Sequence, residues 1–490
     1  MRSKFIVCIT LLCITAGFLG AAEKVKKTGL DYSAIDKLVD GGAYDKAIAA
    51  IEKDGKDPKK AKIYVKQNDV LYNLDKGLVA HYAGKYDVSF TNLEDAERLI
   101  AEYGADAASR ASLDLAKAYE GEIYESIYDS VFNALNNYNK GDIEGARVEA
   151  RQINEKLTAL LQVQRAELAQ AQADAEKQMQ GIDKVPVRPV VFNSSALGSY
   201  LTMVLLRGYS DVGPFAAQIT NAYNVSKNVY NHPVPASIAA ERSVPNGQAR
   251  INIIGFTGLS PVKEDEKIEK ELQGLTFLTR ALQTAAAASG GAVDLAYVGQ
   301  TFETKTLNYN VPSIKANKGS DGTWTTVPRS SEIDRIEVKV GDQTITLELL
   351  EDMGRVAYET FETKRAAIQT RTYRGALAKT VTAGIAVGTA RAVVMSKAGA
   401  NPIQTKALEA AVNVAEKSLD TTLATPDVSD TRMVRYLPNK AYVGGVNVAP
   451  GAHEVTITYY KGGTVIGKPV VTTIEAKANQ PNIVEVINLK

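Results

Sequence analysis

Apolar residues recur every three or four positions along residues 31–229, and polar residues fill the positions between them. This spacing is typical of amphipathic helices that turn one apolar stripe toward a core. After His232-Pro-Val-Pro235 the pattern changes to short apolar runs that Gly, Ser and Asn separate. Such runs indicate strands and turns. The sequence therefore predicts a multidomain α + β protein with a helical first half.

One short motif, Gly-x-(Tyr or Ile)-x-x-(small residue), occurs three times in the helical half. The glycine is expected to end one helix in the left-handed conformation, and the Tyr or Ile to begin the next. Spacings of 42 and 57 residues differ from the regular 34 of tetratricopeptide repeats, so we expect a degenerate, tetratricopeptide-like array of helical hairpins. The three instances are Gly42-Ala-Tyr-Asp-Lys-Ala47, Gly84-Lys-Tyr-Asp-Val-Ser89 and Gly141-Asp-Ile-Glu-Gly-Ala146.

Tyrosines are concentrated in this array. A helix predicted over residues 113–138 carries an apolar stripe that includes Tyr119, with Tyr124 and Tyr128 on its flank. Such tyrosines either line a concave groove for a ligand or form the seam between packed helices. The tyrosines that we consider as interaction candidates are Tyr86, Tyr119, Tyr124 and Tyr128.

The second half is predicted to mix strands with helices. The expected helices are 267–289 and 351–419. The expected strands are 249–256, 296–302, 336–340, 344–349, 452–460, 463–475 and 482–489. The resulting boundaries are 1–22 for a signal peptide, 23–235 for the tetratricopeptide-like domain, 236–350 for a central α+β domain, 351–425 for a helical segment that packs on it, and 426–490 for a small antiparallel β-module.

The first residues are typical of a secretory signal. Arg2 and Lys4 precede an apolar stretch, and small residues precede Glu23, before which we expect cleavage. Cys8 and Cys13 both lie in this segment, so no cysteine follows it. Lipidation at Cys13 is the alternative, although Thr10-Leu-Leu12 lacks the small residue usually found before a modified cysteine. We therefore expect export to the periplasm or the periphery of the outer membrane.

Motifs for chemistry are scarce in this chain. His81, His232 and His453 show no metal-ligand spacing, and no phosphate-binding glycine loop or Gly-x-Ser-x-Gly motif is present. The sequence therefore predicts no catalytic residue, metal or cofactor. Lys plus Arg number 57 against 56 for Asp plus Glu, so the overall charge does not favour nucleic acid as a partner.

Charged residues near the end of the long helical segment are the remaining candidates. Arg371 and Arg374 are expected on one helix face, where they could clamp a carboxylate or a phosphate. The other interpretation is an internal ion-pair network that reaches the tail through Asp430, with Arg432 beside it.

Several short groups of residues, spread along most of the chain, together form a recognisable pattern. They are Lys76-Gly77, Gly84 with Tyr86 and Ser89, Tyr119 to Glu125, Gly141-Asp142, Ala146 to Arg151, Gly258 to Lys263, Ile368 with Arg371, Arg374 and Lys379, Asp430 to Arg432, Leu437-Pro438, and Pro450 to His453. This pattern resembles an uncharacterised family of exported bacterial envelope proteins, often lipoproteins, with a tetratricopeptide-like first half. The resemblance implies envelope localisation and a role in assembly or scaffolding alongside cell-wall synthesis factors. Where relatives have an acidic residue before Gly258-Leu259, this chain has Phe256-Thr257.

These observations lead to one expected function and two alternatives. We expect a non-enzymatic envelope scaffold whose helical array binds other envelope proteins or peptides. A cell-wall or glycan enzyme is the first alternative, and it needs two carboxylates about 5 to 9.5 Å apart in a pocket. A membrane-associated subunit of a larger complex is the second, with the apolar run Val381 to Met395 as its contact.

Overall fold

Helical hairpins build the first half. In three of these hairpins, one of the predicted glycine turns connects the two helices. Gly42, Gly84 and Gly141 have φ angles of +71°, +71° and +82°, and each lies just before a new helix. The small residues of the motif, Ala47, Ser89 and Ala146, are fully buried. The computed structural model describes residues 30–57, 59–104, 118–176, 192, 194–272, 282–284, 287, 293–320, 324–330, 333–396 and 402–490.

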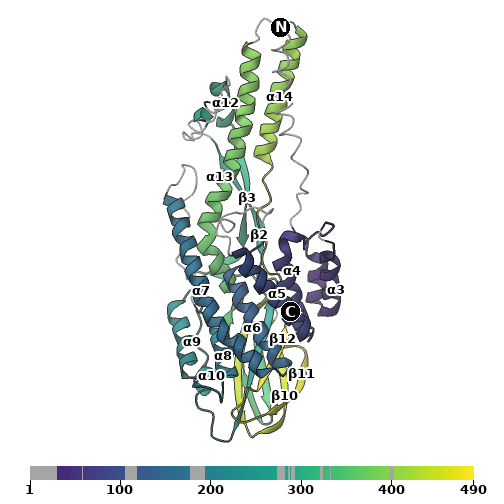
Figure 1. The fold of residues 1–490 in the computed structure, drawn as a ribbon, viewed down its shortest axis with the longest axis vertical. Coiled ribbons are helices and arrows are strands. Elements are labelled where there is room, and N and C mark those ends of the chain that lie inside the picture. Colours follow the sequence, from purple (N-terminus) through teal and green to yellow (C-terminus); the bar gives the residue numbers. More distant parts are fainter. Residues whose placement is uncertain are drawn as a thin grey trace.

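These hairpins form a helical layer on one side of the molecule (Figure 1). The predicted signal peptide lies outside the described residues. The helices are α2 (Ser33–Asp40), α3 (Tyr44–Gly55), the short η1 (Lys66–Asn68), α4 (Asp69–Tyr82), α5 (Tyr86–Gly104), α6 (Ile123–Asn139), α7 (Ile143–Glu176), α8 (Ala196–Leu205), α9 (Gly213–Val225) and α10 (Ala236–Ala240).

Two four-stranded sheets stack beneath the helical layer. The first has the order β12-β1-β9-β8, with β12 parallel and β9 antiparallel to β1, and the second has the order β11-β10-β6-β7. Their strands are β1 (Ala249–Leu259), β6 (Arg335–Val340), β7 (Gln343–Thr346), β8 (Glu348–Asp352), β9 (Pro438–Val448), β10 (Gly451–Lys461), β11 (Thr464–Ala476) and β12 (Ile483–Asn488).

Alternation along β1 explains the layering. Ile254 and Phe256 pack into the core shared with the helices, whereas Ile251 and Ile253 pack into the core between the two sheets. Successive side chains of a strand point to opposite faces, so a strand that is apolar at both sets of positions must be covered on both faces. The body is therefore a helical layer on a β-sandwich.

A long arm projects from the body (Figure 1). Its main helix, α13 (Met353–Ser396), has 44 residues, which corresponds to about 66 Å at 1.5 Å per residue. A separate core that includes Phe302, Tyr373 and Leu419 joins the arm's elements. The other elements in and near the arm are α14 (Pro402–Ala424), α12 (Leu295–Glu303), the paired β2 (Lys263–Glu271) and β3 (Thr306–Ile314), and the short hairpin β4 (Ala316–Lys318) with β5 (Trp324–Thr326).

Two local predictions are wrong. Residues 296–302 form helix α12 instead of a strand, because Asp294 caps the helix and Val298 and Phe302 share a buried face one turn apart. The predicted helix 267–289 begins as strand β2, where pairing with β3 overrides the helical preference of Lys and Glu. Most of its remaining residues lie outside the described part of the chain.

The expected separate β-module at 426–490 is also wrong. Its strands 452–460, 463–475 and 482–489 are confirmed nearly as predicted, but they divide between the two sheets. β10 pairs with β6, and β12 pairs with β1. The tail therefore completes a sandwich whose other strands come from the central region. The predicted helix 351–419 is confirmed as α13 and α14.

Candidate functional site

The inner face of the helical layer is the surface on which we expected a bound peptide, and the chain's own residues 432–437 lie across it. Glu125 on α6 accepts a hydrogen bond from the backbone N–H of Val434 at 2.7 Å. Asp75 on α4 accepts one from the N–H of Arg435 at 2.7 Å. Tyr82 donates its hydroxyl to the carbonyl of Tyr436 at 2.7 Å. Side chains of two helices thus hold three consecutive residues by their backbone.

Side chains of this segment complete the attachment. Arg435 forms an ion pair with Asp36 on α2, and Arg329 joins the same carboxylate at 3.0 Å. Tyr436 is fully buried, and Val434 and Leu437 are nearly so. The segment therefore fills the inner face with both apolar contacts and ion pairs.

Burial changes the acidity of the carboxyls that hold the segment. It raises the pKa of Glu125 to about 7, and the charge of Glu122 raises it further in the same direction. Burial also raises the pKa of Asp75 to about 7, against the hydrogen bonds from Arg435 and Tyr64. These two carboxyls titrate near neutral pH while they hold the backbone of another part of the chain.

A charged junction lies at the start of α6, next to the base of the arm. Glu122 accepts bonds from Lys263 on β2 at 2.6 Å and from Lys364 on α13 at 3.0 Å. Although burial opposes it, these two ammonium groups lower the pKa of Glu122 to about 2. Through one carboxylate that stays ionised, the junction therefore connects the helical layer to strand β2 and to helix α13 of the arm.

A second carboxylate, Glu351 on β8, joins the first half of α6 to its neighbours. It accepts hydrogen bonds from Tyr128 at 2.7 Å, from Tyr230 at 2.8 Å, from Ser195 and from the backbone of Leu197. Burial raises the pKa of Glu351, while these donors oppose the rise. All of these groups are used within the fold.

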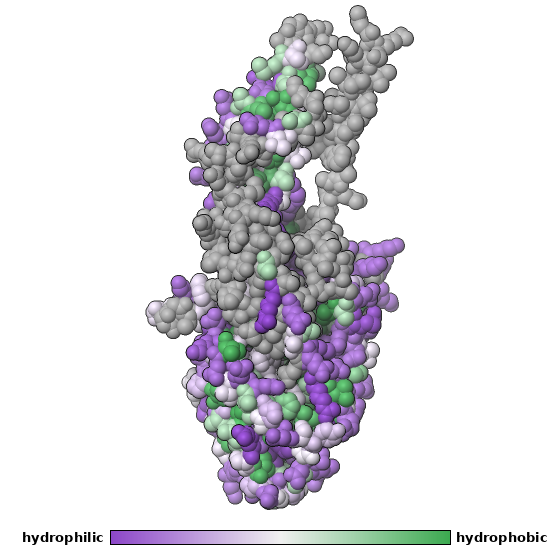
Figure 2. All heavy atoms as spheres, turned by 60° about the vertical axis from the view of Figure 1, so that its left-hand side comes forward, coloured by the Kyte–Doolittle hydropathy of each residue, from purple (hydrophilic) through white to green (hydrophobic). Residues whose placement is uncertain are grey.

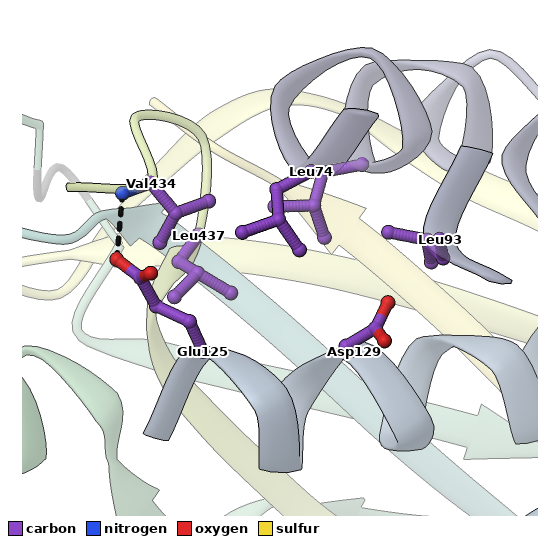
Figure 3. A pocket seen from close by; sticks show the side chains of 7 residues that line it. Leu74, Leu93, Glu125, Asp129, Val434 and Leu437 are labelled. Carbon is purple, nitrogen blue, oxygen red and sulfur yellow. Dashed lines mark hydrogen bonds between the residues drawn. The ribbon is translucent and has the colours of Figure 1, made fainter. Parts of the chain in front are cut away.

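A small cavity lies between the segment and the helices (Figure 3). Glu125 and Asp129 face it from successive turns of α6, and the rest of its lining is leucine and valine. The cavity is too narrow to admit a water molecule. The glycan enzyme considered above would need two carboxyls, and Glu125 and Asp129 both have a raised pKa. A sugar cannot reach them, because the cavity is too narrow.

The structure places the four tyrosine candidates in or beside the packed core. Tyr119, Tyr124 and Tyr128 are buried, so they form the seam between packed elements and line no groove. Tyr119 precedes α6 instead of lying on it, and its hydroxyl donates to Glu125 at 2.8 Å. Tyr86 is half-buried at the start of α5, with its ring 5.6 Å from that of His81.

The four charged candidates fall into two separate places. Arg371 and Arg374 lie one turn apart on α13, both half-buried. Asp430 forms a bidentate pair with Arg432, at 2.9 and 2.7 Å, and does not join the two arginines of α13. The guanidinium of Arg432 also lies over the ring of Tyr119, 5.6 Å from its centre.

Sequence reasoning missed Asp75 and Tyr82, which hold the segment, and Glu351, which joins β8 to the helices. Asp75 and Tyr82 lie on an ordinary amphipathic helix, where nothing distinguishes them from solvated polar positions. Glu351 offered one signal, because an acidic residue directly after Leu349-Leu350 interrupts an apolar strand and needs buried donors.

Comparison with protein-family models, curated proteins and solved structures found no match. The arrangement of residues uses the polar groups of the helical face for the chain itself and leaves the arm as the projecting element.

Proposed function

We propose that this protein is a non-enzymatic scaffold of the bacterial cell envelope that holds protein partners through its projecting arm. The helical hairpins, which share the turn motif of tetratricopeptide-like arrays, serve as the rigid base. Residues 432–437 already occupy their inner face, so a partner needs another surface. The leader-like first residues and the resemblance described above support the envelope as the compartment.

The single observation that carries this proposal is the exposure of large apolar side chains on a helical pair that extends away from the body. Met395 at the end of α13 and Val414 on α14 are 61% and 63% exposed, and Val393 is 39% exposed. Figure 2 shows hydrophobic residues on the upper, arm part of the visible face. Apolar side chains on a projecting element are typical of surfaces that bind another protein.

Crosslinking in cells, followed by purification of the full chain, tests this function. The double variant Met395→Glu and Val414→Glu places charges on the arm without touching the body. We expect it to lose the partners that the native chain retains, because burying a charge in an apolar interface is costly.

The matched control is Val470→Glu with Val471→Glu on β11. These valines are similarly exposed, at 47% and 56%, and they belong to a sheet of the body. The control should keep the partners. Recovery of the same partners by the arm variant, or their equal loss in both variants, would reject the arm as the binding element.

Contact with a membrane is the second candidate, and one observation favours it. Among the described helices, α13 is long and apolar enough to cross a bilayer by length and composition, and 28% of its most apolar window is buried. Co-sedimentation of the native chain with lipid vesicles would support this candidate. Retention of protein partners without vesicle binding would support the scaffold.

A further inference from the structure

Three glutamates approach one another on the side of the helical layer. Glu94 and Glu97 lie one turn apart on α5, and Glu149 reaches them from α7. One carboxylate oxygen from each lies within 4.8 Å of the others. Like charges at this distance repel, so the arrangement is unfavourable unless a positive charge lies between them.

Two carboxylates here lack hydrogen-bond donors although they are buried. Glu149 is only 7% exposed, and its buried Oε2 has no hydrogen-bond partner among the described residues. Asp129 on α6 is 2% exposed, and neither of its oxygens has one. Buried polar groups are nearly always satisfied, so these unpartnered oxygens on the neighbouring helices α6 and α7 indicate a missing ligand.

Lys156 on α7 is the cation that the structure places in this group. Its ammonium donates to Glu97 at 2.5 Å and to Ser130 at 2.7 Å. One lysine faces four carboxyls. Burial raises the pKa of Glu149 to about 7 and raises the pKa of Glu94 and of Asp129, while Lys156 opposes these rises.

We propose that Glu94, Glu97 and Glu149 bind a calcium ion. Carboxylate oxygens are the ligands of hard divalent cations. Ca²⁺ takes oxygens at about 2.4 Å in a flexible geometry, so carboxylate oxygens that lie within 4.8 Å of one another can bind one such ion. Mg²⁺ demands near-ideal octahedral geometry at about 2.1 Å, which three carboxylates on two helices match less readily.

The proposed ion joins successive hairpins. Glu94 and Glu97 lie on the second helix of the α4–α5 hairpin, which turns at Gly84, and Glu149 lies on the second helix of the α6–α7 hairpin, which turns at Gly141. Calcium would replace the ammonium of Lys156 on Glu97, and the flexible lysine chain would turn to solvent. Lys156 therefore competes with calcium for the site.

Thermal unfolding of the full chain, in EDTA and with added CaCl₂ or MgCl₂, tests the site. We expect CaCl₂ to raise the midpoint by about 2–4 °C and MgCl₂ to raise it less. Glu149→Gln should abolish the calcium effect, since it removes a ligand charge while keeping the side-chain shape. Lys156→Met should lower the calcium dissociation constant severalfold in titration calorimetry, because it removes the competing cation.

The matched control is Glu102→Gln, an exposed residue of α5 that pairs with Arg98 outside the cluster. It should respond to calcium as the native chain does. Two results would overturn the site. One is an unchanged midpoint in the native chain and in Lys156→Met at about 10 mM CaCl₂, well above the dissociation constants of weak extracellular sites. The other is a calcium response that survives in Glu149→Gln or disappears equally in Glu102→Gln.

Discussion

Single buried carboxylates connect parts of this chain that lie hundreds of residues apart. Glu485 on β12 pairs with His81 on α4 at 2.7 Å, and Glu351 on β8 pairs with Tyr128 on α6. Glu485 occupies a helix-facing position of its strand, between Ile483 and Ile487, where an apolar residue would be expected. Removing one partner of such a pair leaves a buried group unsatisfied and costs about 3–5 kcal/mol when the group is charged.

Glu125→Gln is predicted to change how stability depends on pH. The folded chain keeps a proton on Glu125 up to about pH 7, whereas the unfolded chain releases it near 4.5. Between these values the folded state binds more protons, so the free energy of unfolding falls as pH rises, by on the order of 3 kcal/mol for this group. Asp75 acts in the same direction. The variant should therefore show a smaller fall between pH 5 and pH 8 than the native chain, with the remainder due to Asp75 and the other buried carboxyls.

Urea unfolding at several pH values measures this slope. Glu102→Gln serves as the control, because its side chain is exposed and pairs with Arg98. A slope in Glu125→Gln equal to that of the native chain would show that Glu125 ionises normally in the folded state.

At the scale of elements, close packing decides how α12 joins the arm. Gly384 and Gly388 lie one turn apart on α13, facing Val298 and Phe302 of α12. The backbone N–H of Asp294, which caps α12, donates to the carbonyl of Gly388 at 3.0 Å. The glycines in the apolar run 381–395 thus allow α13 to pack closely against α12 within the arm.

Gly388→Ala is predicted to loosen α12 from α13. Its added Cβ would lie 2.6 Å from a methyl carbon of Val293 and 2.8 Å from one of Val298, so the two helices must separate. We expect a loss of about 1–3 kcal/mol and faster hydrogen exchange in α12. Gly375→Ala on the same helix meets no atom within 4 Å and should be neutral or stabilising. Equal effects of the two substitutions would contradict this packing.

At the scale of the whole molecule, non-local pairing holds the parts together. The last strand, β12, lies parallel to β1 with Ile253 opposite Val484, and it is an edge strand of the first sheet. Segment 432–437 links the arm helix α14 to β9 while it fills the helical face. The body therefore depends on the last sixty residues for both of its cores.

An isolated fragment of residues 426–490 is predicted to remain unfolded. It would keep the hairpin β10–β11 but lose β6, β1 and the helices that cover its apolar residues. A two-stranded hairpin alone is at best marginally stable in water. Amide signals of the fragment should be narrowly dispersed in NMR spectra. Widely dispersed signals, as in a folded domain, would instead support the independent β-module that the sequence predicted.

Local sequence patterns predicted helices and turns well where interactions between residues close in sequence determine the backbone conformation. The turn glycines 42, 84 and 141 need positive φ, and helix starts follow each of them. Strand β2 shows where this fails, since its Lys and Glu favour a helix and only pairing with β3 makes it a strand. The tyrosine stripe likewise indicated a buried or a binding face equally well, because periodicity shows that a face is apolar but does not identify what covers it.

The sequence by itself determined the helical first half, the turns between hairpins, the long arm helices and the strands of the tail. Each depends on residues a few positions apart, through periodicity, capping and the conformational freedom of glycine. Only the tertiary structure decided that the tail strands join a sandwich, that residues 432–437 cover the helical face, and that Glu94, Glu97 and Glu149 meet. These outcomes depend on contacts between residues far apart in the chain, where many alternative partners satisfy the same local pattern.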